Sequence, residues 1–289
     1  MPRTLLVLAL ALQVPAAARF DSNRAWEHLR QLVAIGPRPS GSAALEETRR
    51  YLKGQLAAAG LPVSEQMWEA RTPTGSVRMV NLIATIAGRS KDRIVIAGHY
   101  DTKRFREFRF VGANDGGSSA AFLLELGRVL NLRKNPLTLE LLFLDGEEAV
   151  IEWEGTDHTY GSRHYVEEAK QSRSLMSLKA FVLIDMIGDR DLRIRRDLNS
   201  TRWLTDLVWD SARRKGLAGY FSPETTQIED DHLPFVEAGV PSVDIIDLDY
   251  PAWHTEGDTL DAVSARSLQV VADVVLAALP KVEARVKPR

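Results

Sequence analysis

The sequence contains no cysteine among its 289 residues. This absence excludes disulfide-stabilised scaffolds, cysteine-ligated zinc, iron–sulfur clusters and thiol nucleophiles. A bound metal ion would therefore have to be held by histidine, aspartate and glutamate. The sequence also lacks an excess of basic residues, because 37 lysines and arginines face 39 aspartates and glutamates. A protein that binds phosphate backbones needs such an excess or a basic patch, so we expect no nucleic-acid partner.

The first eighteen residues show the three parts of a secretory signal. Arg3 is positively charged, an apolar run extends from Thr4 to Leu12, and three alanines at 16–18 form a small-residue cleavage site. This run is too short to cross a bilayer, and no other segment of the sequence is long and apolar enough. We therefore expect residues 1–18 to be removed as a signal peptide. Residues 19–289 are predicted to form a single exported catalytic domain, periplasmic or extracellular, without a membrane span.

Short apolar runs alternate with helical patterns along the rest of the chain. The runs predict buried strands at Ile94–Ala97, Leu139–Leu144, Phe181–Ile184 and Val243–Ile246, with a weaker one at Asn81–Ile86. Helices are predicted around them, at 44–59, 118–130, 165–171, 200–215, 232–238 and 264–279. Strands that alternate with helices are typical of an α/β fold with a mostly parallel sheet.

Histidines and acidic residues follow the predicted strands. Since ligands of an open α/β sheet bind outside the carboxyl ends of its strands, these residues predict one common site. Imidazole and carboxylate groups together are typical zinc ligands. The candidate ligands are His99, Asp115, Glu148, Asp185 and His254.

Two further residues have roles that their spacing suggests. Asp101 lies two residues after His99, so on a strand it faces the same way and could orient the imidazole. Glu147 and Glu148 are adjacent, so one can bind the metal while the other moves protons. Burial and neighbouring negative charge raise the pKa of such a carboxyl group into the working range.

The order of these motifs resembles the zinc-dependent exopeptidases of the aminopeptidase type, peptidase family M28. A branch of that family, the glutaminyl-peptide cyclotransferases, is more similar still. The similar segments are 99–103, 110–115, 143–149, 160–164, 228–235 and 253–255. The resemblance implies a three-layer α/β/α sandwich with a mixed, mostly parallel central sheet.

The resemblance also implies how the metal is held. One zinc ion per chain is expected on Asp115, Glu148 and His254. His99, with Asp101 and Asp185, is then the remnant of a second metal site or lies behind the ligands and orients them.

The same resemblance implies the reaction and its participants. Glu147 corresponds to the proton shuttle, and Asp185 and Asp231 to an acidic network around it. Trp153 and Trp253 correspond to walls of the substrate pocket. The substrate is the N-terminal glutamine of a peptide or protein, which becomes pyroglutamate with release of ammonia. We expect the enzyme to be a monomer.

Two other interpretations remain open from the residues alone. A two-zinc aminopeptidase would use His99 and Asp185 as full ligands and Glu147 as the base that activates water. A catalytically silent binding domain would have no need for the intact pair of Glu147 and Glu148.

Overall fold

The computed structural model describes residues 19–286. Its main sheet has six strands in the order β1-β2-β4-β3-β5-β8. These strands are β1 (Val63–Thr72), β2 (Gly75–Ile86), β3 (Ser90–His99), β4 (Leu137–Leu144), β5 (Leu178–Asp185) and β8 (Ser242–Ile246). Strands β3, β4, β5 and β8 run parallel, whereas β1 and β2 form an antiparallel hairpin that joins β4. The sheet is therefore mixed and mostly parallel, as predicted.

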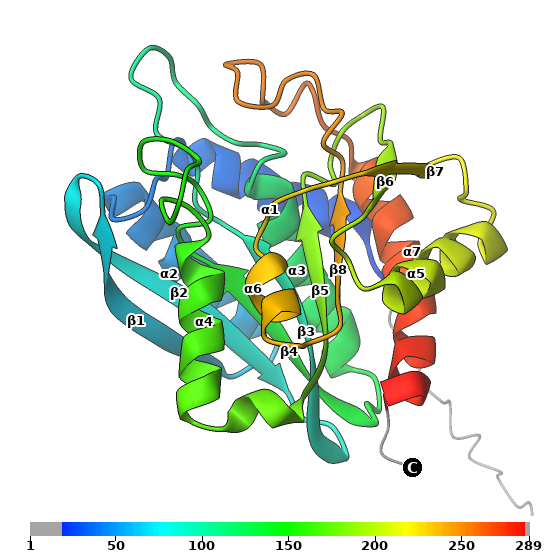
Figure 1. The fold of residues 1–289 in the computed structure, drawn as a ribbon. Coiled ribbons are helices and arrows are strands. Elements are labelled where there is room, and N and C mark those ends of the chain that lie inside the picture. Colours follow the sequence, from blue (N-terminus) through cyan, green and yellow to red (C-terminus); the bar gives the residue numbers. More distant parts are fainter. Residues whose placement is uncertain (1–18, 287–289) are drawn as a thin grey trace, which may run out of the picture.

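Helices cover both faces of this sheet (Figure 1). Helices α1 (Ser22–Ile35), α3 (Gly117–Asn131) and α7 (Ala265–Val286) lie on one face, and α4 (Tyr160–Gln171) and α6 (Leu233–Glu237) lie on the other. The remaining elements are α2 (Ala43–Ala58), α5 (Arg202–Arg214), the short 3-10 helix η1 (Ser174–Ser177) and a separate parallel pair, β6 (Ile194–Asp197) and β7 (Phe221–Thr226). The predicted three-layer α/β/α architecture is confirmed.

The central strands are apolar on both sides because both of their faces are covered. In β3, Ile94 and Ile96 point into the core beneath α1, α3 and α7. Their neighbours Val95 and Ala97 point into the core beneath α4 and α6. Because successive residues point into two different apolar cores, these consecutive residues are all apolar, and the sequence shows a continuous apolar run.

Several parts of the fold differ from the sequence prediction: the pair β6 and β7 was not predicted, and α4 begins five residues before the predicted helix at 165–171. Strand β1 was not predicted, because it is a largely exposed edge strand with the polar sequence VSEQMWEART. Helix α7 continues through Pro280 to Val286, although a proline normally ends a helix. Val282, beyond the proline, is buried in the main core, so tertiary packing extends the helix past the local break.

No helix within residues 19–286 combines the length and the apolarity that a membrane crossing requires. The predicted signal segment, residues 1–18, lies outside the described residues.

Candidate metal centre and active-site cavity

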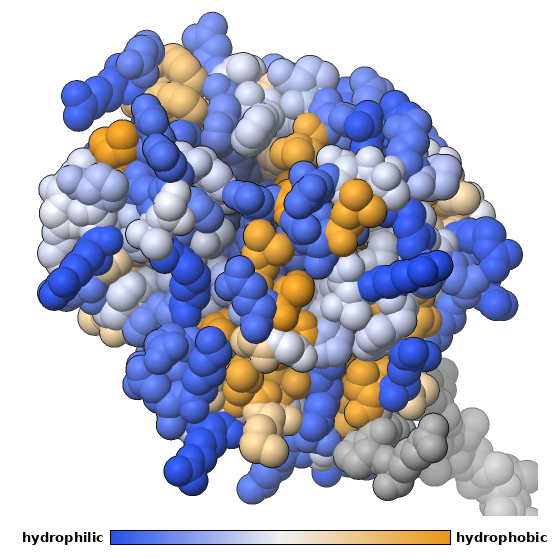
Figure 2. Space-filling view, viewed as in Figure 1, coloured by the Kyte–Doolittle hydropathy of each residue, from blue (hydrophilic) through white to orange (hydrophobic). Residues whose placement is uncertain are grey.

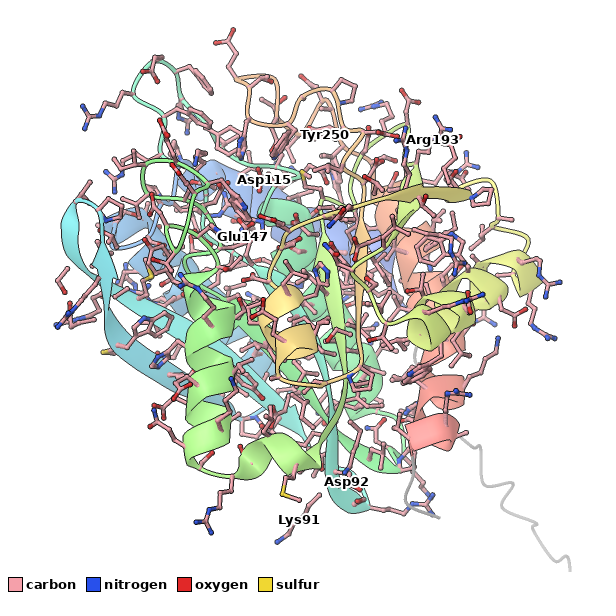
Figure 3. The ribbon with its side chains drawn as sticks, in the orientation of Figure 1. Lys91, Asp92, Asp115, Glu147, Arg193 and Tyr250 are labelled. Carbon is pink, nitrogen blue, oxygen red and sulfur yellow. The ribbon has the colours of Figure 1, made fainter. Side chains whose placement is uncertain are left out.

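The carboxyl ends of the parallel strands meet at one edge of the sheet, and the predicted site residues gather there. His99 and Asp185 are the last residues of β3 and β5. Figure 3 shows Asp115 and Glu147 together at this edge, with Lys91 and Asp92 of β3 at the opposite end of the molecule. Residues far apart in the sequence thus converge as the sheet topology requires.

His254, Asp115 and Glu148 form the first group that could hold a metal ion. His254 Nε2 lies 3.3 Å from Asp115 Oδ2 and 3.3 Å from Glu148 Oε1. Ligand atoms placed tetrahedrally at about 2.0 Å from a zinc ion are about 3.3 Å apart, so the spacing fits. Apart from His254, no hydrogen-bond donor among residues 19–286 reaches Asp115 Oδ2 or Glu148 Oε2, although both atoms are buried. The donor set and these two buried oxygens both suit a divalent cation.

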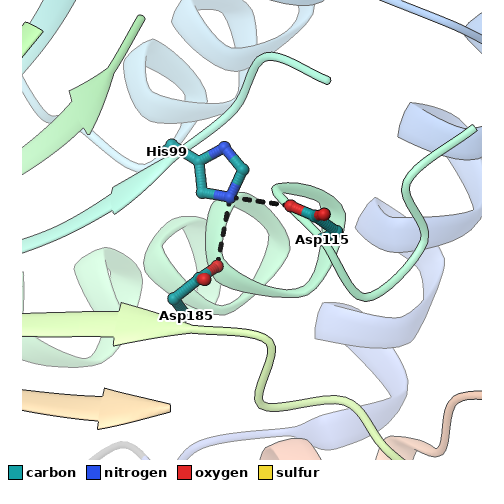
Figure 4. A group of neighbouring side chains, drawn as sticks. All are labelled: His99, Asp115 and Asp185. Atoms are coloured by element: carbon teal, nitrogen blue, oxygen red, sulfur yellow. Dashed lines mark hydrogen bonds and ion pairs between the residues drawn. The ribbon is translucent and has the colours of Figure 1, made fainter. Parts of the chain in front are cut away.

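His99 stands at the centre of a second group, with Asp115 and Asp185 (Figure 4). Its Nε2 lies 3.1 Å from Asp115 Oδ1 and 3.1 Å from Asp185 Oδ1. Its Nδ1 faces Asp101 Oδ1 at 3.5 Å, on the side where a residue that orients the ring was predicted. Burial alone would lower the pKa of His99, but the negative charges of Glu147 and Asp185 raise it well above its usual value. Asp115 belongs to both groups and links them.

Glu147 is buried beside His99 and directly precedes Glu148 in the chain. Its Oε2 lies 3.7 Å from His99 Nδ1, and its backbone N–H donates to Asp101 Oδ1 at 3.4 Å. Burial raises the pKa of Glu147 well above the usual range, and the charges of Glu148 and Asp230 act in the same direction against the opposing effect of His99. A carboxyl group with a raised pKa beside metal ligands can both accept and donate a proton.

A cavity of about 510 Å³ opens over these residues. Its acidic floor includes Asp115, Glu147, Glu148 and Asp185, and its walls are largely apolar. Both predicted pocket tryptophans line it, Trp153 at 36% exposure and Trp253 at 45%. The other apolar lining residues are Ile151, Met186, Ile228, Ile246 and Leu248. In Figure 2, apolar side chains follow the middle of this face of the molecule and hydrophilic side chains flank them.

The structure distinguishes between the adjacent acids Asp230 and Asp231, of which the family resemblance predicts only Asp231 in the acidic network. Asp230 lines the cavity, and burial together with the charge of Asp185 raises its pKa well above the usual range. Asp231, the predicted network residue, is fully buried outside the cavity lining and accepts a hydrogen bond from Ser162 Oγ at 2.5 Å. Sequence reasoning missed Asp230 because both residues lie outside any strand or helix, so no periodicity shows which of them faces inward.

The backbone is forced into unusual conformations at this site. Gly116, just after Asp115, has φ +73°, and a Cβ there would lie 2.4 Å from the carbonyl oxygen of Asp101. Only glycine fits this close approach. His254 has φ +54° and Met186, after Asp185, has φ +43°. Left-handed backbone in residues other than glycine is uncommon and persists where surrounding structure holds it in place.

The fold and the site together define an enzyme of the zinc-exopeptidase type, and comparison with known proteins agrees. Residues 81–279 match peptidase family M28. The glutaminyl-peptide cyclotransferase-like protein of Mus musculus is 33% identical over 272 residues, covering 83% of this chain and 70% of that protein. The glutaminyl-peptide cyclotransferase of Gloydius blomhoffii is 32% identical over 294 residues, covering 88% of this chain and 79% of that protein.

Solved structures share the same fold. A glutaminyl cyclase from an Acidobacteriales bacterium superposes with a TM-score of 0.89 at 39% identity, covering 96% of this chain and 100% of that one. A structure from Bacteroides thetaiotaomicron described as a leucine aminopeptidase precursor has a TM-score of 0.82 at 27% identity, covering 91% and 98%. The chain belongs to peptidase family M28 and, within it, to the glutaminyl-peptide cyclotransferases. The predicted resemblance is therefore confirmed.

Proposed function

We propose that this protein is a zinc-dependent glutaminyl-peptide cyclotransferase. It converts the N-terminal glutamine of peptides or proteins into pyroglutamate and releases ammonia. One observation carries the proposal: Glu147, with its raised pKa, lies beside the group of Asp115, Glu148 and His254 on the floor of an apolar-walled cavity. The family membership of the chain supports the same activity.

The reaction requires a proton to move from the α-amino nitrogen of the bound glutamine to its side-chain amide nitrogen. The α-amino nitrogen of the substrate forms a bond to its own γ-carboxamide carbon, and the bond from that carbon to the amide nitrogen breaks. Glu147 accepts a proton from the amine and delivers one to the leaving nitrogen, which departs as ammonia. Because the attack is intramolecular, the cavity has only to hold the side chain folded back toward its amine.

Asp115, Glu148 and His254 would hold the zinc ion, one per chain. When bound there, zinc supplies Lewis-acid polarisation of the carboxamide oxygen. His99 and Asp101 act from behind these ligands, because the His99 ring is held between Asp115, Asp185 and Asp101.

The surroundings of Glu147 adjust its charge and exclude water. Asp185 and Asp230 line the cavity beside Glu147, and Asp231 supports Asp230 from behind by donating its backbone N–H to Asp230 Oδ1 at 2.5 Å. Several buried acids in one place favour retention of a proton among them, which keeps Glu147 able to exchange one. The indole rings of Trp153 and Trp253 keep bulk water from the reacting carbon.

Zinc-supplemented protein tests the proposal with two substrates. A peptide that begins with glutamine should yield pyroglutamate and ammonia, detected by mass spectrometry and an ammonia assay. A leucine chromogenic amide should remain intact. Hydrolysis of the leucine amide with no pyroglutamate from the first peptide would overturn the proposal.

That opposite result would favour the two-zinc aminopeptidase. The observation in its favour is that Asp115 is shared between the two candidate metal groups, so a second ion on His99 and Asp185 is chemically reasonable. Metal counting per chain separates the two activities, since the cyclotransferase proposal expects one zinc ion.

We also propose that the chain is exported after cleavage behind Ala18. The mature enzyme would then meet peptide N-termini in the periplasm or outside the cell. N-terminal sequencing of the secreted protein tests this, and a mature chain that still carries the apolar run of residues 4–12 would contradict it.

A further inference from the structure

One buried residue, Asp258, accepts hydrogen bonds from three consecutive backbone N–H groups of the loop that carries Asp115. The N–H of Ala113 donates to the Asp258 carbonyl oxygen at 3.3 Å. The N–H groups of Asn114 and Asp115 donate to the two carboxylate oxygens, at 2.7 and 3.1 Å. A single residue thereby fixes the backbone of a segment that has no regular secondary structure of its own.

Asp258 also belongs to the loop that carries His254, four residues earlier. Tyr250, on the same loop, donates its hydroxyl group to Asp258 Oδ1 at 2.8 Å and lies near Asp115 in Figure 3. From the other side, the buried Arg38 guanidinium donates to the carbonyl oxygens of Val111 and Gly112, at 2.6 and 2.9 Å. The loop is therefore held by a carboxylate at its amides and a cation at its carbonyls.

A second carboxylate, Asp157, holds another loop of the cavity wall in a similar way. Asp157 accepts from the N–H groups of three consecutive residues, 150–152, at 3.1, 2.8 and 3.1 Å. Tyr160 donates its hydroxyl group to Asp157 Oδ1 at 2.6 Å. This loop follows Glu148 and carries Trp153 into the cavity wall.

We propose that Asp258 is a positioning residue for the metal centre, and that Asp157 is its counterpart for the substrate pocket. Asp258 couples the loop of His254 to the loop of Asp115, which sets the 3.3 Å spacing between their ligand atoms. Asp157 shapes the loop of Trp153 and touches neither of these two ligand loops. The inference rests on the metal centre and cyclotransferase activity proposed above.

The physical reason lies in how a metal site depends on its supports. Groups behind the ligands hold them in place, and their loss typically weakens metal binding about 10- to 100-fold. In Asp258→Asn, one acceptor oxygen becomes an amide NH₂ that cannot accept from the backbone N–H facing it. The same change in Asp157→Asn breaks an equivalent contact in the other loop. The two variants therefore carry the same chemical change and differ in the loop whose backbone hydrogen bonds are lost.

The test measures zinc affinity by competition with a chromogenic chelator, together with melting of the metal-free proteins. Asp258→Asn should bind zinc at least tenfold more weakly than the wild type, and its cobalt-substituted form should change its visible absorption. Asp157→Asn should keep zinc affinity within twofold and raise KM for a glutamine peptide severalfold. The two variants should lose similar amounts of thermal stability.

Wild-type zinc affinity in Asp258→Asn, or an equal loss of affinity in both variants, would overturn the inference. If Asp258→Asn does not fold, Tyr250→Phe provides the same test, because it removes only the hydroxyl donor to Asp258. Zinc affinity should then fall by a smaller factor, and unchanged affinity would count against the inference. Zinc affinity needs no turnover, so a protein that shows this pattern but cyclises no glutamine peptide would refute the proposed function and leave the role of Asp258 standing.

Discussion

The indole ring of Trp153 lies flat against the imidazole of His158, with ring centroids 4.2 Å apart and 9° between the planes. His158 lies at the end of the same loop, just before α4, and its side chain is half-buried. The rest of the Trp153 side chain is partly open to solvent, at 36% exposure. The stack therefore orients the indole that forms part of the cavity wall.

Removal of this stack should weaken substrate binding. In His158→Ala we expect KM for a glutamine peptide to rise about two- to tenfold with little change in kcat, since an aromatic stack contributes about 0.5–1.5 kcal/mol. Steady-state kinetics measures this directly. His164→Ala is the matched control, because His164 stacks on Trp68 with centroids 4.2 Å apart, outside the cavity lining. A similar rise in KM in both variants would contradict the role of His158.

Glu147→Gln should separate proton transfer from metal binding. We expect kcat to fall about 10²- to 10⁴-fold, because the amide cannot accept the substrate proton. Zinc content should stay at the wild-type level, since Glu147 is not among the three proposed ligands. Single-turnover assays and metal analysis test both points, with Glu154→Gln, an exposed acid on the neighbouring loop, as the control. Retained turnover in Glu147→Gln would assign the proton transfer to another group.

Zinc should stabilise the folded protein. A ligand that binds only the folded state adds about 2.7 kcal/mol to the free energy of unfolding at 100 times its dissociation constant. The melting temperature should therefore rise on zinc addition and fall after chelation. His254→Ala should lose most of this response, whereas His28→Ala should keep it, because His28 contacts Tyr51 outside the site. Equal responses in both variants would exclude His254 as a ligand.

The buried Asp247 should make stability depend on pH. Burial, assisted by the charge of Asp189, raises the pKa of Asp247 to about 7. The folded state then keeps a proton that the unfolded chain releases near pH 4, so the free energy of unfolding falls as pH rises between about 4 and 7. This contribution is at most about 1.4 kcal/mol per pH unit.

The substitution Asp247→Asn removes the titrating carboxyl group. In the wild type, the two carboxylate oxygens of Asp247 accept hydrogen bonds from the backbone N–H groups of Arg193 and Asp249, and the asparagine keeps only one of these two acceptor oxygens. The stability of the wild type relative to the variant should therefore decrease from pH 5 to pH 7 and level off above it. Chemical denaturation at several pH values measures the difference. A difference that is the same at pH 5 and pH 8 would show that Asp247 is ionised in the folded protein throughout this range.

Much of the fold could be predicted because it depends on local patterns. Strands β3, β4, β5 and β8 are buried on both faces, so their apolar runs are visible without any knowledge of their neighbours. Strand β1 was missed, because an exposed edge strand carries no such run. The full length of α7 was also missed, since the burial of Val282 that holds the helix beyond Pro280 is a tertiary contact.

The sequence by itself determined the kinds of groups at the site and the order in which they come. Without cysteine, a metal could only be held by histidine and carboxylates, and parallel strand ends bring such residues to one edge of the sheet. Only the tertiary structure decided which atoms face each other. It placed Asp230 rather than Asp231 in the cavity lining, and it joined Asp258 to the amides of a loop more than 140 residues earlier. Such contacts depend on loops without periodicity, whose backbone groups find partners only when the chain is folded.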